Sequence, residues 1–372
     1  MRVPEEAAAL GFGFYGTIRK TASDQEAWLH RLKLSRERRV VNSVLKNEVE
    51  LAAFLKRKGW VRPDETVSIE PLHGGVSNEV WKVTGESFSW VVKQAHGKLK
   101  VKADWYSDVA RIERERDAMR IMAARLPAGA IPEVIHYDGE AYVLVMACAP
   151  DGSLNWKERL LEGEWDRRTA SEAGRLLGLF HERSRRLDPT ERGLFADLRF
   201  FRQLRLDPFY GYVAERHPAL RESILQLADE LTQEAECLVH GDYSPKNLLI
   251  APDRGIVALD FEVAHWGNPV FDVAFCATHL ILKGIAQRNT DACLTNIEAF
   301  LAGYGGTVRR LLPHIGLLLM ARIDGKSPVG YLQAEFHDPI RKLAAAWIVK
   351  EGTAETAFEQ DRRELLGKLR EG

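Results

Sequence analysis

Hydrophobic and polar positions divide the chain into a strand-rich part and a later, mainly helical part. Three short runs rich in valine and aromatic residues, VSIEPL, EVWKVTG and SWVVKQA, fall between residues 67 and 95 and are punctuated by glycines, which predicts an antiparallel meander. Helical spacing then dominates four stretches, which are 166–187, 197–236, 270–303 and 308–322. The pattern predicts a small β-rich lobe, a hinge near residues 146–150 and a larger helical lobe.

Further elements complete the predicted layout. A helix begins near Val44, and one of its faces is expected to carry Leu45, Val49, Ala52 and Leu55. A charged helix across 109–126 precedes an apolar strand over 141–147. A strand pair, NLLI and IVALDF, interrupts the helical part and is joined by the turn APDRG.

The first 43 residues differ from the rest of the chain. They show no sustained period, and RLKLSRERR concentrates five basic residues. We expect a loosely attached extension or an upstream-shifted start, with a partner-binding arm as the alternative. The predicted division is therefore an extension over 1–43, an N-lobe over 44–148 and a C-lobe over 149–372.

Composition limits the possible partners. Lys and Arg number 52 against 53 Asp and Glu, so the net charge is −1 and no overall field favours nucleic acid or an anionic membrane. The four cysteines form no CxxC pair, which argues against a disulfide framework and a zinc site and favours a reducing, cytoplasmic setting. We expect a protein without nucleic-acid or membrane partners; its oligomeric state is left open.

The strand pair of the helical part carries a concentration of polar side chains. HGDYSPKNLL, residues 240–249, holds Asp242 and Asn247 just before one strand, and LDFE holds Asp260 just after the other. Pairing of the two strands brings these three side chains together. Carboxylate and amide oxygens are suitable ligands for Mg2+, and a further carboxylate can accept the proton of an attacking hydroxyl. The pattern therefore indicates phosphoryl transfer.

HGDYSPKN followed by LDFEVAHWGNPVFDVAF resembles the aminoglycoside phosphotransferase family, which includes choline and methylthioribose kinases. The resemblance covers residues 46–350 and implies the α+β class, in a bilobal protein-kinase-like fold with a small antiparallel-sheet N-lobe and a larger, mainly helical C-lobe. It also implies ATP and Mg2+ as cofactors and transfer of the γ-phosphoryl group to a hydroxyl of a small polar molecule. Gly241 and Glu262 replace the Arg and Gly of the protein-kinase motifs, which favours a small-molecule kinase.

The resemblance assigns roles to the residues of both motifs. Asp242 would be the catalytic base, and Asn247 and Asp260 would hold Mg2+. His240 and Asp272 would brace the catalytic loop.

On the nucleotide side, the resemblance places the turn LHGGVSNEVWKV over the phosphates, where main-chain N–H groups would come from Gly74, Gly75, Val76 and Ser77. Lys93 would reach the α- and β-phosphates and pair with a glutamate of the charged helix. Glu113 and Glu115 both compete for this role. Glu115 is favoured because Ala118, Met119 and Met122 follow it on one helix face.

Adenine would lie against the hinge, bound by main-chain groups of Met146, Ala147 and Cys148, with Val92 and Leu249 as apolar walls.

The acceptor is less defined by the sequence. Candidate contacts are Glu262, Trp266, Arg322 and Asp324, and Arg202, Arg205 and Tyr210 lie on a helical stretch that could border the same space. A sugar, an amino alcohol or an aminoglycoside-like molecule would fit. Nucleotidyl transfer and a nucleotide-binding pseudokinase are the alternatives on the same fold, although the four residues Lys93, Asp242, Asn247 and Asp260 together argue against a pseudokinase.

Overall fold

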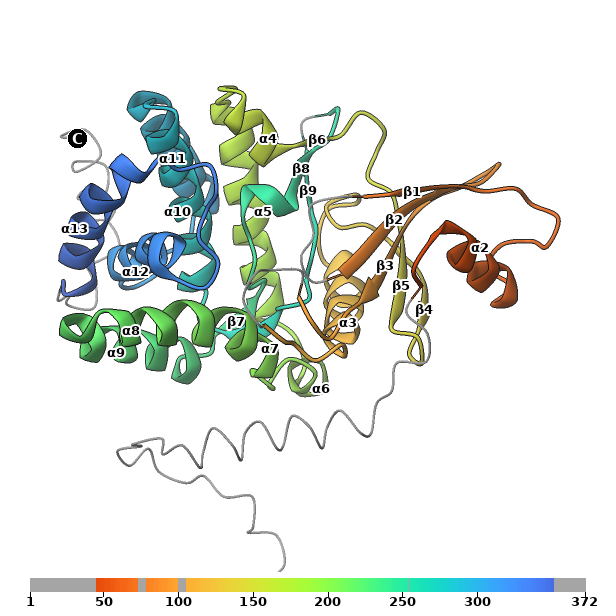
Figure 1. Cartoon of the computed structure of the whole chain (residues 1–372), viewed down its shortest axis with the longest axis horizontal. Helices are drawn as coiled ribbons and strands as arrows, with labels where there is room; N and C mark the ends of the chain where they lie inside the picture. The colour runs from red at the N-terminus through yellow and green to blue at the C-terminus, as the bar shows by residue number, and fades with distance from the viewer. Residues whose placement is uncertain (1–44, 73–77, 100–104, 254, 351–372) are drawn as a thin grey trace, which may run out of the picture. The chain divides into compact units, whose positions relative to one another are not determined.

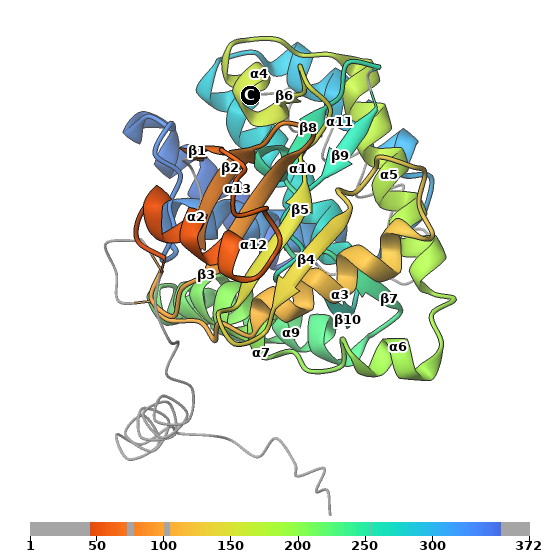
Figure 2. The same cartoon turned by 90° about the vertical axis from the view of Figure 1, so that its right-hand side faces the viewer.

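The computed structural model describes residues 45–72, 78–99, 105–253 and 255–350. All of them lie in the unit Val44–Gly372. The strand-rich part is an antiparallel sheet in the order β1-β2-β3-β5-β4 (Figures 1 and 2). Its strands are β1 Ser68–Pro71, β2 Asn78–Thr84, β3 Ser89–Ala95, β4 Val134–Asp138 and β5 Val143–Ala147. The predicted meander is confirmed, and β4 is an addition at the sheet edge.

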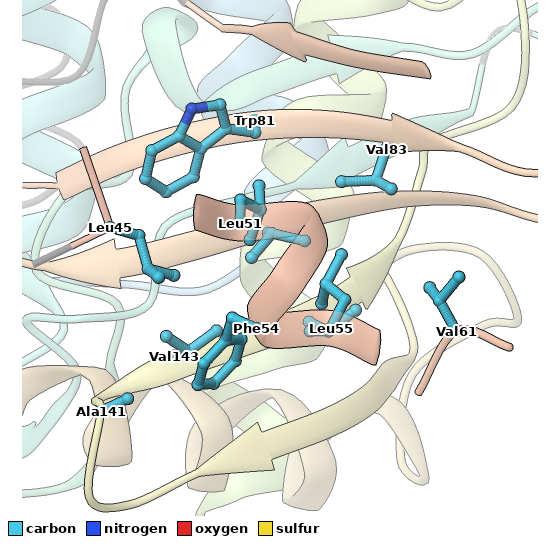
Figure 3. Packing of buried hydrophobic residues seen from close by; sticks show 11 residues of the cluster. Leu45, Leu51, Phe54, Leu55, Val61, Trp81, Val83, Ala141 and Val143 are labelled. Carbon is cyan, nitrogen blue, oxygen red and sulfur yellow. The ribbon is translucent and has the colours of Figure 1, made fainter. Parts of the chain in front are cut away.

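Helix α2, Glu48–Arg57, packs on one face of this sheet (Figure 3). Its buried residues are Leu51, Phe54 and Leu55. The cluster around them includes Trp81, Val83, Val92, Val143 and Val145 from the strands. The predicted apolar face was therefore wrong at Val49, which is 78% exposed, because the helix is rotated to bury Leu51 and Phe54 instead.

Successive side chains of β3 point to opposite faces of the sheet, so the strand contributes both to the α2 cluster and to the Lys93 site. Val92 is fully buried in the α2 cluster, so its predicted role as a wall of the adenine site is wrong. Lys93, the next residue, points to the opposite face, as does Val91 two residues before it. Helix α3, Arg111–Ala123, lies on the Lys93 side, where Glu115 meets the lysine.

The helical part contains shorter elements than the sequence predicted. They are α4 Trp156–Leu161, α5 Arg167–Ser184, α6 Pro189–Gly193, α7 Arg199–Phe201, the π-helix η1 Arg202–Gly211, α8 Tyr212–Arg216, η2 Pro218–Leu220, α9 Arg221–Gln233, α10 Val270–Ala286, α11 Thr290–Tyr304, α12 Leu311–Asp324, η4 Ala334–Phe336 and α13 His337–Ile348. The predicted helical stretch over 197–236 is interrupted at His217, because Pro218 lacks the N–H that a regular helix requires, whereas Pro208 lies inside the π-helix η1. The predicted helix over 270–303 is divided where Asn289 caps α11.

Two small sheets hold the polar motifs. β8, Leu248–Ile250, pairs with β9, Ile256–Ala258, as the sequence predicted, and β6, Leu154–Asn155, joins them. β7, Cys237–Val239, pairs with β10, His265–Gly267. The loop over 240–247, which we call the catalytic loop after its predicted role, runs from β7 through the single turn η3, Pro245–Asn247, into β8.

Helix α10 lies at the centre of the helical part and is buried from its first residue to Gly284. It contacts α11 and α12, and α11 in turn packs tightly on α5. A Cβ on Gly174 of α5 would collide with the backbone of α11, so a glycine is needed for this close approach. This packing holds the first turn of α10 against the loop that carries Asp242. No helix among the described residues has the length and apolar character needed to cross a membrane.

Candidate active site

Asp242 lies at the centre of a set of polar contacts in the catalytic loop. Its Oδ2 accepts a hydrogen bond of 2.7 Å from Asn247 Nδ2, and its Oδ1 lies 2.6 Å from Arg205 Nη2. Lys246 Nζ is 3.8 Å from Oδ2. Arg205 also donates to the carbonyl of Gly241, which fixes the guanidinium against the loop. The carboxylate is therefore held in one orientation by two cations and an amide.

Gly241 allows the loop to take this path. Its φ of +78° lies in the left-handed region, and a Cβ would come within 2.8 Å of Val263. The bulky Arg of the protein-kinase motif does not fit this backbone position.

Asp272, in the first turn of α10, braces the loop from below. Its two carboxylate oxygens accept hydrogen bonds from the main-chain N–H groups of His240, at 2.6 Å, and Gly241, at 2.9 Å. His181 Nε2 lies 3.0 Å from the same carboxylate. Burial alone would raise the pKa of Asp272, but these donors and the nearby histidines outweigh it and lower the pKa. The predicted bracing by Asp272 is confirmed.

His240 links the loop to the strand that precedes Asp260. Its Nδ1 accepts a hydrogen bond from the N–H of Asp242, so Nε2 carries the proton and donates to the carbonyl of Leu259. Burial lowers the pKa of His240, which keeps the ring neutral in this bridging role.

We predict that Asp272→Asn lowers the free energy of unfolding by at least about 2 kcal/mol, because an amide keeps one acceptor but loses charge-assisted hydrogen bonds. The lowered pKa of Asp272 gives the pH dependence: its contribution is present above the unfolded-state pKa of about 3.9 and is lost as pH falls through the folded-state value. The stability difference between parent and variant should therefore shrink below about pH 4. Thermal unfolding from pH 3 to 7 measures it.

Asp291→Asn is the matched control, since Asp291 also lies in the first turn of a helix but is exposed. A constant difference between parent and Asp272→Asn across this pH range would contradict the assignment.

Lys93 is the centre of the second group of charges. Its Nζ lies 2.8 and 2.9 Å from the two oxygens of Glu115 and 2.8 Å from Asp260 Oδ1. Glu113, the competing residue, instead accepts a hydrogen bond from Tyr137. Burial would lower the pKa of Lys93, but the surrounding carboxylates outweigh it and raise the pKa, so the lysine is charged.

Glu262, predicted as an acceptor contact, forms part of this group around Lys93. Its Oε2 accepts hydrogen bonds from Arg111 Nε at 3.1 Å and Asn78 Nδ2 at 2.9 Å. Carboxylate oxygens of Glu262, Glu115 and Asp260 lie within 4.8 Å of one another. Arg111 was not predicted from the sequence, although it precedes Glu115 by one helical turn on the face that identified the glutamate.

Asp260 and Asn247 are brought together by the strand pair. Leu259 N–H donates to the carbonyl of Asn247 at 2.9 Å, which places Asp260 beside the catalytic loop. Burial would raise the pKa of Asp260, but Lys93 and Lys246 lower it well below its usual range. Asn247 donates from its Nδ2 to the main-chain carbonyl and the carboxylate of Asp242, so its Oδ1 is the side-chain atom that could hold a metal ion. This set of hard oxygen donors fits Mg2+.

Of the predicted phosphate-binding turn and the predicted adenine-binding hinge, the structure describes only the hinge. Gly74, Gly75, Val76 and Ser77 lie outside the described residues. At the hinge, Met146 and Ala147 end β5. The N–H groups of Ala147 and Cys148 donate to the carbonyls of Glu133 and Ser89, so adenine would have to use other main-chain groups or exchange these bonds.

The other acceptor candidates are dispersed. Trp266 lies under the guanidinium of Arg192, 4.9 Å from it. Asp324 is bound by His217 and Arg341. Arg322 interacts electrostatically with Asp242.

The fold and these charged groups define a kinase-like class of phosphotransferases. An antiparallel sheet carries Lys93, which is paired with Glu115, and the later, mainly helical part carries the loop with Asp242. The chain belongs to the phosphotransferase enzyme family, whose sequence profile matches residues 68–314. It is 23% identical over 253 residues to the methylthioribose kinase of Yersinia pseudotuberculosis serotype O:1b (strain IP 31758), covering 59% of this chain and 60% of that protein. The chain thus spans about 60% of the length of the curated relatives it matches.

A solved structure agrees with the predicted fold class. The ethanolamine kinase of Plasmodium vivax superposes with a TM-score of 0.51 at 15% identity, covering 92% of this chain and 93% of that one. The α+β, kinase-like fold predicted from the motifs is confirmed.

Proposed function

We propose that the protein is an ATP-dependent small-molecule kinase that transfers the γ-phosphoryl group to a hydroxyl of a small polar acceptor. The observation that supports it best is the contact of Lys93 with Asp260 across 167 positions of sequence, beside the loop that carries Asp242 and Asn247. Positioning and charge stabilisation are the main requirements of phosphoryl transfer.

Asp242 accepts the proton of the acceptor hydroxyl as its oxygen attacks the γ-phosphorus. The new bond joins that oxygen to phosphorus, and the bond to the β,γ-bridging oxygen breaks, so ADP leaves. Arg205 and Lys246 flank the carboxylate and are suited to offset charge on the transferred group.

Asn247 and Asp260 would hold Mg2+, which neutralises phosphate charge when bound. Lys93 spans Glu115 and Asp260, and the phosphates would take over part of its hydrogen bonding while Glu115 keeps it in place. The main chain of Gly74 to Ser77 would cover the phosphates.

The remaining parts of the proposal concern organisation. The hinge at Met146 to Cys148 would hold adenine between an N-lobe over 44–148 and a C-lobe over 149–372, with 1–43 as an extension. The acceptor is a small molecule. Four unpaired cysteines fit a reducing, cytoplasmic setting.

The test is ADP release by the purified protein with ATP, Mg2+ and a library of sugars, amino alcohols, hydroxy acids and aminoglycosides. We expect at least one acceptor to stimulate ADP release, with formation of a phosphorylated product that requires Mg2+. Transfer of AMP to the acceptor, with release of pyrophosphate, would replace this proposal with nucleotidyl transfer. ATP binding without turnover of any acceptor would contradict kinase activity.

A further inference from the structure

Cationic and polar side chains gather on the helical side of Asp242. We call them the basic cluster, which consists of Arg205, His279, Lys283, Arg322 and Tyr331. Arg205 connects the cluster to the catalytic loop, because it forms an ion pair with Asp242. The guanidinium carbons of Arg205 and Arg322 each lie 5.7 Å from the centre of the Phe209 ring, so both arginines lie close to the same ring.

Helix α10 extends the cluster away from the catalytic loop. Phe275, His279 and Lys283 follow one another at four-residue spacing and therefore share a face of the helix. Arg205 lies 5.6 Å from the ring of Phe275, whose ring packs edge-on against His279 at 4.8 Å. Tyr331 closes the far end, with its ring centre 5.4 Å from Lys283 Nζ.

Several buried hydrogen-bond donors of the cluster have either no partner or only a neutral partner among the described residues. Lys283 is only 1% exposed, and its Nζ donates to the carbonyl of His279, a neutral group, at 3.2 Å. Tyr331 Oη and Arg322 Nε are buried and have no hydrogen-bond partner among the described residues. Burial of cations and donors without a carboxylate opposes folding, so such an arrangement is typical of a site that receives an anion.

Burial is the largest influence on the pKa values of the cluster, and neighbouring cations act in the same direction. Burial and the charges of neighbouring lysines and arginines hold the pKa of His279 well below its usual range. Burial also lowers the pKa of Lys283 to about 7; the Cys276 thiol acts against this shift, and Lys157 and Arg322 act in the same direction as burial. Asp242 is the carboxylate that acts on Arg322. A bound anion would be stabilised here, whereas a polycationic acceptor would be repelled.

We infer that the acceptor carries a carboxylate or phosphate group, which binds to Lys283, Arg322 and Tyr331 while its hydroxyl reaches Asp242. This inference rests on the proposed kinase function. Both anions offer several acceptor oxygens to the same cationic and hydroxyl donors, so one site can serve either.

The test compares acceptors that differ in the anionic group: glycerate with glycerol, gluconate with glucitol, serine with ethanolamine, and ribose 5-phosphate with ribose. We expect at least one anionic member to exceed its uncharged or cationic partner about 10-fold or more in kcat/KM. The pair that shows this preference distinguishes carboxylate from phosphate.

Lys283→Met and Arg322→Gln should each raise KM for that anionic acceptor at least about 10-fold while changing KM for ATP less than about twofold. Lys283→Met should fold at least as well as the parent, because it removes a buried cation that has no carboxylate partner in the described part of the chain. Arg221→Gln, at the exposed start of α9, is the control and should change neither KM.

A preference for the uncharged or cationic partners in all four pairs would overturn the inference while leaving the kinase function in place. An effect of both variants on KM for ATP, without an effect on KM for the acceptor, would assign the cluster to the nucleotide and also overturn it. Failure of the kinase function itself is distinct, since no acceptor would then increase ADP release, and the inference would fall with it.

Discussion

Asp242→Asn is expected to lower kcat by at least about 100-fold while ATP affinity stays within about twofold of the parent. The amide cannot accept the hydroxyl proton, yet it has nearly the shape of the carboxylate. The nucleotide is expected to meet Lys93 and Asp260, and neither is altered. Steady-state ADP release with the best acceptor and a separate ATP-binding titration measure the two effects.

Asp253→Asn is the matched control, since Asp253 is an exposed aspartate on the turn between β8 and β9. Thermal unfolding must accompany the kinetics because Arg205 loses a charged partner in Asp242→Asn, although it retains the carbonyls of Gly241 and Leu204. A folded variant with near-parental kcat would remove Asp242 from the role of base.

The sequence predicted local elements well where composition and period agree. β3 has the predicted bounds because SWVVKQA combines β-branched and aromatic residues between loop signals. The apolar residues that follow Glu115 favoured it over Glu113 as the partner of Lys93, and Lys93 does contact Glu115 in the structure. Both inferences depend on neighbours within two helical turns or one strand, which are visible in a single sequence.

Features that depend on distant contacts were harder to predict. Strand β4 is half-buried along most of its length, so it lacks the alternation that reveals a strand. The face of α2 was misjudged at Val49, because the sheet beneath it determines which side is buried.

Glu262 illustrates the same limit at the site. Its position two residues after Asp260 suggested the acceptor side, but partners 151 and 184 positions away hold it beside Lys93. Contacts between residues so far apart in the chain leave no local pattern in the sequence. The basic cluster likewise combines residues of η1, α10, α12 and the loop after α12, whose meeting follows from helix packing and not from spacing.

Asp260→Asn is expected to remove the effect of Mg2+ on ATP binding and to lower kcat by at least about 100-fold. The substitution is preferred over alanine because Asp260 has a φ of +72°, a left-handed conformation that asparagine adopts more readily than alanine. It therefore removes the charge that would bind the metal while sparing the backbone. ATP titrations with and without Mg2+ measure the result.

The parent should bind ATP more tightly when Mg2+ is present, whereas in Asp260→Asn the two affinities should agree within about twofold, because the amide oxygen is a much weaker ligand for a divalent cation. Lys93 would keep its two bonds to Glu115, so weak metal-free ATP binding should persist in the variant. This persistence separates loss of the metal from collapse of the site. If Mg2+ still strengthened ATP binding in the variant as it does in the parent, Asp260 would not be the metal ligand, and the neighbouring carboxylate of Glu262 would become the residue to replace next.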